Sequence, residues 1–196
     1  MFSIKKTIEH INLQLFLENI LPSGEAFLEK HFDEIGRIAD VFWQKHLIVF
    51  EIQCSPISLN EVQQRFKDYE KLGLCLVWIL HAGRFNKKKV GHAEYFLRQM
   101  PCYFARVSSS SKAYIYDQKE CFYGAQRIWR GPELPVDLLR PVFSNKTGWK
   151  IHFFGDRVHC ASNPVQANGV VGLVKNRLER FGRAILQFFY ALMVDL

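Results

Sequence analysis

The sequence lacks the features of a secreted or membrane-spanning protein. Its five cysteines are odd in number and form no CxxC pair, so we expect neither a disulfide framework nor a zinc ribbon, and a reducing compartment is the default. No apolar run reaches the roughly 20 residues that a bilayer crossing needs. The segment that follows Lys5 and Lys6 is amphipathic, unlike a secretory signal. We therefore expect a cytoplasmic protein.

A glycine-rich phosphate-binding loop is also missing, which argues against a metabolic phosphoesterase. The chain does have the composition of a folded globular protein, with 48% hydrophobic and 23% charged residues among 196. That length suits one domain with an appendage. We expect a core over residues 1–83, a basic continuation of the same domain over 84–140, and a C-terminal extension over 141–196.

Charge is distributed unevenly along the chain. Residues 1–83 hold 8 Lys and Arg against 11 Asp and Glu, whereas residues 84–196 hold 18 against 8. The first part is therefore near −3 and the second near +10. A basic half beside an acidic half suits a polyanionic substrate, and a solvated basic face without a partner is the alternative.

Apolar spacing predicts an α/β domain with a mixed sheet. A helix capped by Thr7 should run to Leu21 with Ile8, Ile11 and Leu15 facing the core. Further candidates for its core face are Leu13, Phe16 and Ile20. Strands are expected at residues 26–32, 38–43, 47–53 and 74–80. A capping box at Ser58 starts a helix that ends near Leu72, so the last two strands should be parallel.

The second half of the chain gives weaker patterns. We expect a helix that begins at Lys87–Lys89 and ends near Met100. Short strands are expected at residues 102–107, 113–116 and 121–123, the last two joined by a turn at 117–120. A proline-containing loop over 130–145 and a basic amphipathic helix from about Val170 should follow.

Two acidic residues interrupt otherwise apolar strands in the stretch from Arg37 to Gln53. A two-residue turn at Lys45 and His46 would place Asp40 opposite Glu51, and Gln53 would share their face by the period of two. Carboxylates that close repel each other unless a cation lies between them, and Mg²⁺ prefers such oxygen ligands. This pattern indicates a metal-dependent phosphodiester site; the alternative is structural carboxylates, capped by backbone or paired with Arg37.

These residues also carry a family resemblance. The segments RIADVFW, VFEIQCSPIS and GLCLVWIL, with Arg65 and Tyr69 between the last two, resemble in order and spacing the competence protein CoiA-like family. Its core is a nuclease-like domain of the PD-(D/E)XK, restriction-endonuclease-like superfamily. The resemblance implies a mixed four-stranded sheet flanked by helices, and the chain lacks the cysteine-rich segment that often precedes that core.

The resemblance also implies roles for individual residues. Asp40 stands in the place of the metal-binding aspartate, Glu51 in that of the second acidic ligand, and Gln53 in that of the catalytic lysine. Glu9 on the first helix matches an auxiliary metal ligand, although a charge at a helix N-terminus is the alternative reading. Gln53 has the alternative of a buried amide hydrogen-bonded to backbone.

The second helix would contribute substrate contacts. Arg65 and Tyr69 correspond to a pair that lies near DNA in related exonucleases, and Lys67 is a further candidate for phosphate binding. Helix-face packing is the alternative for Arg65 and Tyr69.

The function that follows is a Mg²⁺- or Mn²⁺-dependent deoxyribonuclease that processes or recombines incoming DNA. We expect single-stranded DNA to be favoured over double-stranded DNA, and recombination or DNA-uptake proteins to be partners. The alternative is a nuclease-fold module of little or no activity that binds DNA or those partners, because an amide at Gln53 can hydrogen-bond but carries no charge.

Overall fold

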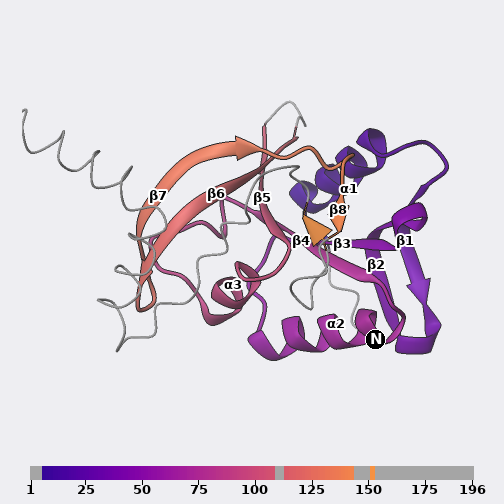
Figure 1. Ribbon diagram of the computed structural model, residues 1–196, viewed down its shortest axis with the longest axis horizontal. Helices are drawn as coiled ribbons and strands as arrows, with labels where there is room; N and C mark the ends of the chain where they lie inside the picture. The colour runs from indigo at the N-terminus through magenta and orange to yellow at the C-terminus, as the bar shows by residue number, and fades with distance from the viewer. Residues whose placement is uncertain (1–5, 109–112, 144–150, 153–196) are drawn as a thin grey trace, which may run out of the picture.

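The computed structural model describes residues 6–108, 113–143 and 151–152. Within these residues the chain forms an α/β domain with a seven-stranded mixed sheet and three helices (Figure 1). The elements of this domain are α1 (Ile8–Ile20), β1 (Ala26–Phe32), β2 (Arg37–Trp43), β3 (Ile48–Gln53), α2 (Leu59–Lys71), β4 (Cys75–His81), α3 (His92–Leu97), β5 (Cys102–Val107), β6 (Ala113–Tyr123) and β7 (Gln126–Pro135). Val142–Phe143 (β8) and Ile151–His152 (β9) pair separately.

The strands lie in the sheet in the order of the sequence, from β1 to β7. Neighbours β1 to β3 and β5 to β7 are antiparallel, whereas β3, β4 and β5 are parallel. The expected four strands are thus present, but a sheet of only four is wrong, because β5, β6 and β7 extend it. Helix α1 covers one face, and α2 and α3 cover the other (Figure 1).

Helix α1 begins and ends where the sequence predicts, with the Thr7 hydroxyl accepting the N–H of His10. The predicted core positions Ile8, Ile11 and Leu15 are wrong, since all three side chains are exposed. Of the further candidates, Leu13 is buried, and Phe16 and Ile20 are partly buried. The side chains buried against the sheet are Leu13, Gln14 and Leu17. Apolar residues lie on most sides of this helix, so spacing alone does not identify its inner face.

The β2–β3 connection differs from the expected two-residue turn. Gln44–His46 form a 3-10 turn that Leu47 closes in the left-handed region at φ +54°. The register of the ladder is nevertheless the one counted from the sequence, with Trp43 opposite Ile48 and Val41 opposite Phe50. The ladder ends at the Val41–Phe50 pair, just before Asp40 and Glu51. Gln44 and Leu47 do not pair in the ladder, so the turn is longer than two residues while the register of the two strands is unchanged.

Three predictions in the second half are wrong. Helix α3 begins at His92, not at Lys87–Lys89. The expected turn at 117–120 is the middle of a continuous β6, and the expected loop over 130–145 begins with β7. Prolines are tolerated in β7 because it ends the strand order of the described sheet.

Polar residues inside β6 pair with two buried arginines. Arg98 donates to Asp117 and to Glu120, each at 2.7 Å. Arg127 bonds Glu120 and lies 2.5 Å from Glu94 of α3. All five side chains are at most 6% exposed. This buried charge network joins α3 to β6 and β7, and it explains why residues that look like a turn lie in a strand.

The expected C-terminal amphipathic helix lies outside the described residues. No helix among the described residues is long and apolar enough to cross a membrane. The cysteines in this part of the chain, Cys54, Cys75, Cys102 and Cys121, are free thiols.

Replacing Arg127 by Ala should destabilise the domain by about 3–5 kcal/mol, because Glu94 and Glu120 would lose a partner in the interior. Arg106→Ala is the matched control: Arg106 pairs with Glu133 at the surface, where an ion pair contributes about 0–1 kcal/mol. Urea denaturation of both variants and the wild type measures the difference. Equal losses in the two variants would contradict a stabilising role for the network.

Candidate functional site

The candidate site lies between the two central strands that carry the acidic residues. Asp40 of β2 and Glu51 of β3 lie next to the last pair of the β2–β3 ladder, Val41 and Phe50. Asp40 is 8% exposed and Glu51 is 1% exposed. Two buried carboxyl groups thus lie on neighbouring strands, and the expectation that they share one face and one cation stays a prediction.

Asp40 is held mainly by groups from the start of the chain. Its Oδ1 accepts a hydrogen bond from Lys6 Nζ at 2.8 Å and lies 3.0 Å from His10 Nε2. Its Oδ2 accepts the backbone N–H of Ile52 at 2.8 Å. Burial by itself raises the pKa of this carboxyl group, but these three groups outweigh burial and the pKa of Asp40 lies below its usual value.

Glu51 is held by helix α2. Its Oε1 accepts the hydroxyl of Tyr69 at 2.6 Å, and its Oε2 pairs with the Arg65 guanidinium. Complete burial and the nearby charge of Asp40 raise the pKa of Glu51 to about 7, although Arg65 and Tyr69 act in the opposite direction. The predicted pair Arg65 and Tyr69 thus contacts the second acidic residue directly.

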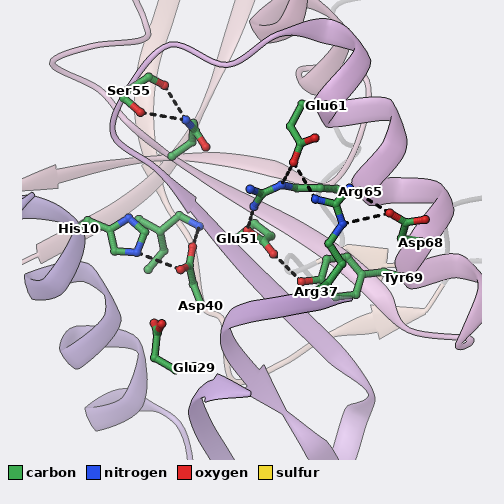
Figure 2. Close-up of polar contacts among 12 residues, drawn as sticks. His10, Glu29, Arg37, Asp40, Glu51, Ser55, Glu61, Arg65, Asp68 and Tyr69 are labelled. Carbon is green, nitrogen blue, oxygen red and sulfur yellow. Dashed lines mark hydrogen bonds and ion pairs between the residues drawn. The ribbon is translucent and has the colours of Figure 1, made fainter. Parts of the chain in front are cut away.

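The two carboxyl groups turn toward different helices. Figure 2 shows Asp40 directed toward His10 on the α1 side, and Glu51 directed toward Arg65 and Tyr69 on α2. Arg65 is also fixed by Glu61, which accepts from its Nε at 2.8 Å. Each carboxyl group therefore has a basic partner of its own.

Gln53 lies two residues beyond Glu51, which places both side chains on the same face of β3. Its Nε2 donates to the backbone oxygen of Ser55 at 2.6 Å and to the Ser55 hydroxyl at 3.3 Å. The amide is half-buried, and no described residue donates to its Oε1. Gln53 can therefore offer an oxygen to a ligand or to water.

Three other basic or acidic residues lie away from this pair. Glu9 is exposed in the first turn of α1, where its own backbone N–H, the Thr7 hydroxyl and more distant positive charges lower its pKa. Lys67 is exposed on α2. Arg37 pairs with Glu61 at 2.8 Å and Asp68 at 3.0 Å, so the alternative in which Arg37 neutralises the strand carboxylates is wrong.

The sequence did not predict the roles of Lys6 and His10. His10 belongs to the Glu9-His10 pair that carries part of the resemblance, yet it is His10 that contacts Asp40. Lys6 precedes the helix and also bonds Glu29, which sits in a left-handed conformation at φ 49°. A contact between the first turn of a helix and a strand about 30 residues later leaves no local signal.

The donor set of the site fits a hard divalent cation. Asp40 and Glu51 offer carboxylate oxygens and Gln53 an amide oxygen, and Mg²⁺ commonly binds one or two carboxylates while water and substrate phosphates complete its shell. Among the described residues, no group of three or more His, Cys, Asp and Glu could hold a metal ion. A cation here would rest on two carboxylates, and it would share them with Lys6 and Arg65.

The mixed sheet and its crossover helix are consistent with a nuclease-like α/β domain. A family model described as "Competence protein CoiA, nuclease-like domain" matches residues 7–129. The chain therefore belongs to the CoiA nuclease-like family. No curated protein and no solved structure matched the chain.

Stability should depend on pH through Glu51. Its pKa is about 7 in the folded protein and about 4.5 when unfolded, so between these values the folded state holds more protons than the unfolded state. The free energy of unfolding should therefore fall as pH rises from about 4.5 to 7, and this fall should be absent in Glu51→Gln.

Urea denaturation in EDTA across pH 5–8 measures this effect. Glu61→Gln is the control, because Arg65 and Arg37 outweigh burial and lower the pKa of Glu61. Its difference from the wild type should stay constant over this range. A wild-type curve that runs parallel to that of Glu51→Gln would contradict the raised pKa.

Proposed function

We propose that this domain is a Mg²⁺- or Mn²⁺-dependent phosphodiesterase that cleaves DNA. The observation that carries the proposal is the pair of buried carboxyl groups, Asp40 and Glu51, on the neighbouring strands β2 and β3, with Gln53 two residues farther on β3. The order of the first helix, three antiparallel strands, crossover helix and parallel strand is the one that the restriction-endonuclease-like superfamily implies.

Asp40, Glu51 and Gln53 would hold the cation, and Glu9 remains a predicted auxiliary ligand. When bound, such an ion polarises a water molecule and stabilises the negative charge that develops on phosphate. The oxygen of Gln53 would orient that water or complete the ligand set, because its nitrogen is already engaged by Ser55.

Gln53 carries no positive charge, so it cannot supply the charge stabilisation that a catalytic lysine would give. Two basic side chains near the acidic pair could supply it instead. Lys6 lies at Asp40 and Arg65 lies at Glu51. Either could help to stabilise a pentacoordinate phosphate, which a catalytic lysine would otherwise do. Lys67 is exposed on α2, and in this proposal it contacts phosphate farther from the reacting group.

DNA is the substrate that the charge favours, since residues 84–196 are strongly basic. Together with the competence family, this supports a role in processing or recombining incoming DNA, in contact with recombination or DNA-uptake proteins. Single-stranded DNA is the form we favour.

A second candidate function is a DNA-binding module that does not cut. The observation in its favour is that Asp40 and Glu51 already have basic partners, Lys6 and Arg65, in place of an ion. In this case the ion pairs would hold the fold together, and the binding surface would lie elsewhere on the domain.

Cleavage of labelled DNA with Mg²⁺ or Mn²⁺ separates the two functions. Asp40→Asn and Glu51→Gln should each lower the cleavage rate by about a hundredfold or more, because loss of a ligand removes several kcal/mol of charge stabilisation. Asp33→Asn is the matched control, since Asp33 is exposed in the turn after β1, and it should cleave like the wild type.

The metal itself provides an independent readout. Binding of Mn²⁺, followed by electron paramagnetic resonance, should weaken in Asp40→Asn and in Glu51→Gln but not in Asp33→Asn. Equal cleavage by all four proteins would end the nuclease proposal, and DNA binding without cleavage under either metal would establish the second function.

A further inference from the structure

The loop that follows β4 joins the edge of the β6–β7 hairpin. Figure 1 shows this hairpin as a long curved arm on the side of the sheet away from β1. The N–H of Arg127 donates to the oxygen of Lys88 at 2.7 Å, and the N–H of Val90 donates to Ala125 at 2.9 Å. Lys89 forms an antiparallel bridge with Gln126. The segment from Lys87 to Lys89, which does not form the expected helix, therefore lies along β7.

Side chains from the hairpin hold this loop from the inside. Arg127 donates to the backbone oxygen of Lys87, and Arg130 donates to that of Asn86 at 3.1 Å. Asn86 is buried in a left-handed conformation at φ 53°, and its amide donates to Tyr116 and Gln118, each at 3.0 Å. The backbone of the lysine loop is thus fixed by buried polar contacts.

The three lysine side chains of this loop are directed outward. Lys87, Lys88 and Lys89 are exposed, and in the part of the chain that the structure describes none forms an ion pair. Two carboxylates of the hairpin region, Glu94 and Glu120, are buried and already paired with Arg127. Among the described residues, positive charge therefore faces solvent here without an ion-pair partner.

Exposed aromatic rings lie on the hairpin face to which Lys89 belongs. Phe122 and Arg127 pair across the hairpin and point to α3, where they meet Tyr95 and Glu94. The next pair, Tyr123 and Gln126, therefore lies on the opposite face, and Lys89 joins it across the sheet. Tyr123 is 58% exposed.

Trp129 continues the aromatic row. It pairs with Cys121, and although the ladder has a register shift directly after this residue, Cys121 and Tyr123 are both exposed and lie two positions apart on β6. A Cβ on Gly131 would lie 3.0 Å from Trp129 Cη2 and 3.3 Å from Lys119 Cβ. The end of the indole ring therefore lies close to Gly131, while 42% of Trp129 stays exposed. A larger side chain at position 131 would crowd the ring.

The loop begins near the start of α1 and the end of β3. Burial lowers the pKa of His81 at the end of β4. The charge of Glu9 raises this pKa, and the charges of Arg84 and Lys87 lower it. The charge of Arg84 also acts on Glu9 and on Cys54, close to the end of β3. Basic side chains therefore lead from the neighbourhood of the acidic pair toward the hairpin.

We propose that Lys87–Lys89, Tyr123 and Trp129 form a binding surface for single-stranded DNA, here called the hairpin surface. It rests on the proposed function in that DNA is the substrate. The lysines contact successive phosphates, and the two rings stack on unpaired bases, whose faces a duplex hides. This surface would lead a strand along the loop toward Asp40 and Glu51.

Fluorescence anisotropy with a labelled oligothymidine, in EDTA and over about 50–200 mM salt, tests the hairpin surface. The full chain carrying Lys87→Ala, Lys88→Ala and Lys89→Ala should bind about tenfold or more weakly, with a salt slope flatter by about 2. The control is a triple variant with Lys30→Ala, Lys45→Ala and Lys71→Ala. These three lysines are exposed and lie in the first half of the chain, so the variant loses the same charge and should bind like the wild type.

Aromatic stacking is tested separately. Trp129→Ala should weaken binding of the oligothymidine about tenfold, whereas Trp129→Phe should retain most of it and binding of a duplex should change little. Wild-type affinity in the loop triple variant, or equal losses in both triple variants, would overturn the surface. A duplex bound as tightly as the single strand, with no effect of Trp129→Ala, would point instead to duplex or protein recognition and overturn the proposal.

The failure of this proposal and of the nuclease proposal can be told apart. Asp40→Asn should lose cleavage but bind the oligothymidine like the wild type, because the Asp40 side chain is buried next to α1, away from the hairpin surface. If the wild type binds DNA through the hairpin surface but shows no cleavage, only the nuclease proposal is refuted. Cleavage that survives together with unchanged binding in the loop triple variant refutes only the hairpin surface.

Discussion

The structure depends on the pairing of charges that lie inside the protein. A buried carboxylate is costly unless hydrogen bonds and opposite charge compensate it. Glu51, which is almost fully enclosed, can lie on a central strand only because Arg65 and Tyr69 reach it from α2. That contact joins the strand to the crossover helix and so sets the distance between the sheet and its second layer.

The same constraint operates in two places with different consequences. In the hairpin region, Arg98 and Arg127 satisfy Glu94, Asp117 and Glu120, and the result is a rigid support for the lysine loop. At the candidate site, compensation of Glu51 is incomplete, because burial and the charge of Asp40 still raise its pKa to about 7. A bound cation would stabilise the charged form of such a buried acid. For this reason the functional proposal rests on Asp40 and Glu51 and not on the buried charge network of the hairpin region.

Predictions succeeded where a feature has a local cause. The hydroxyls of Thr7 and Ser58 cap helices as their spacing indicates, and the apolar run over residues 74–80 corresponds to a strand buried on both faces. The β2–β3 register also followed from the sequence as far as the Val41–Phe50 pair, since the pairing of a hairpin is unchanged when its turn takes one residue from each strand. The inner positions Ile8, Ile11 and Leu15 of α1 were wrong because apolar residues surround the helix. The middle of β6 was missed because its polar residues are neutralised by arginines distant in the chain.

The sequence by itself determined the order of the first helix, the three antiparallel strands and the crossover to β4, together with the acidic pair and its link to a known family. These features depend on the period of apolar residues and on capping, which act over a few positions. Tertiary structure alone decided the partners of each charge: Lys6 and His10 for Asp40, and the joining of the lysine loop to β7. Such contacts link residues about 30 or more positions apart, and they are selected by the cost of leaving a buried charge or backbone group unpaired, which no local pattern records.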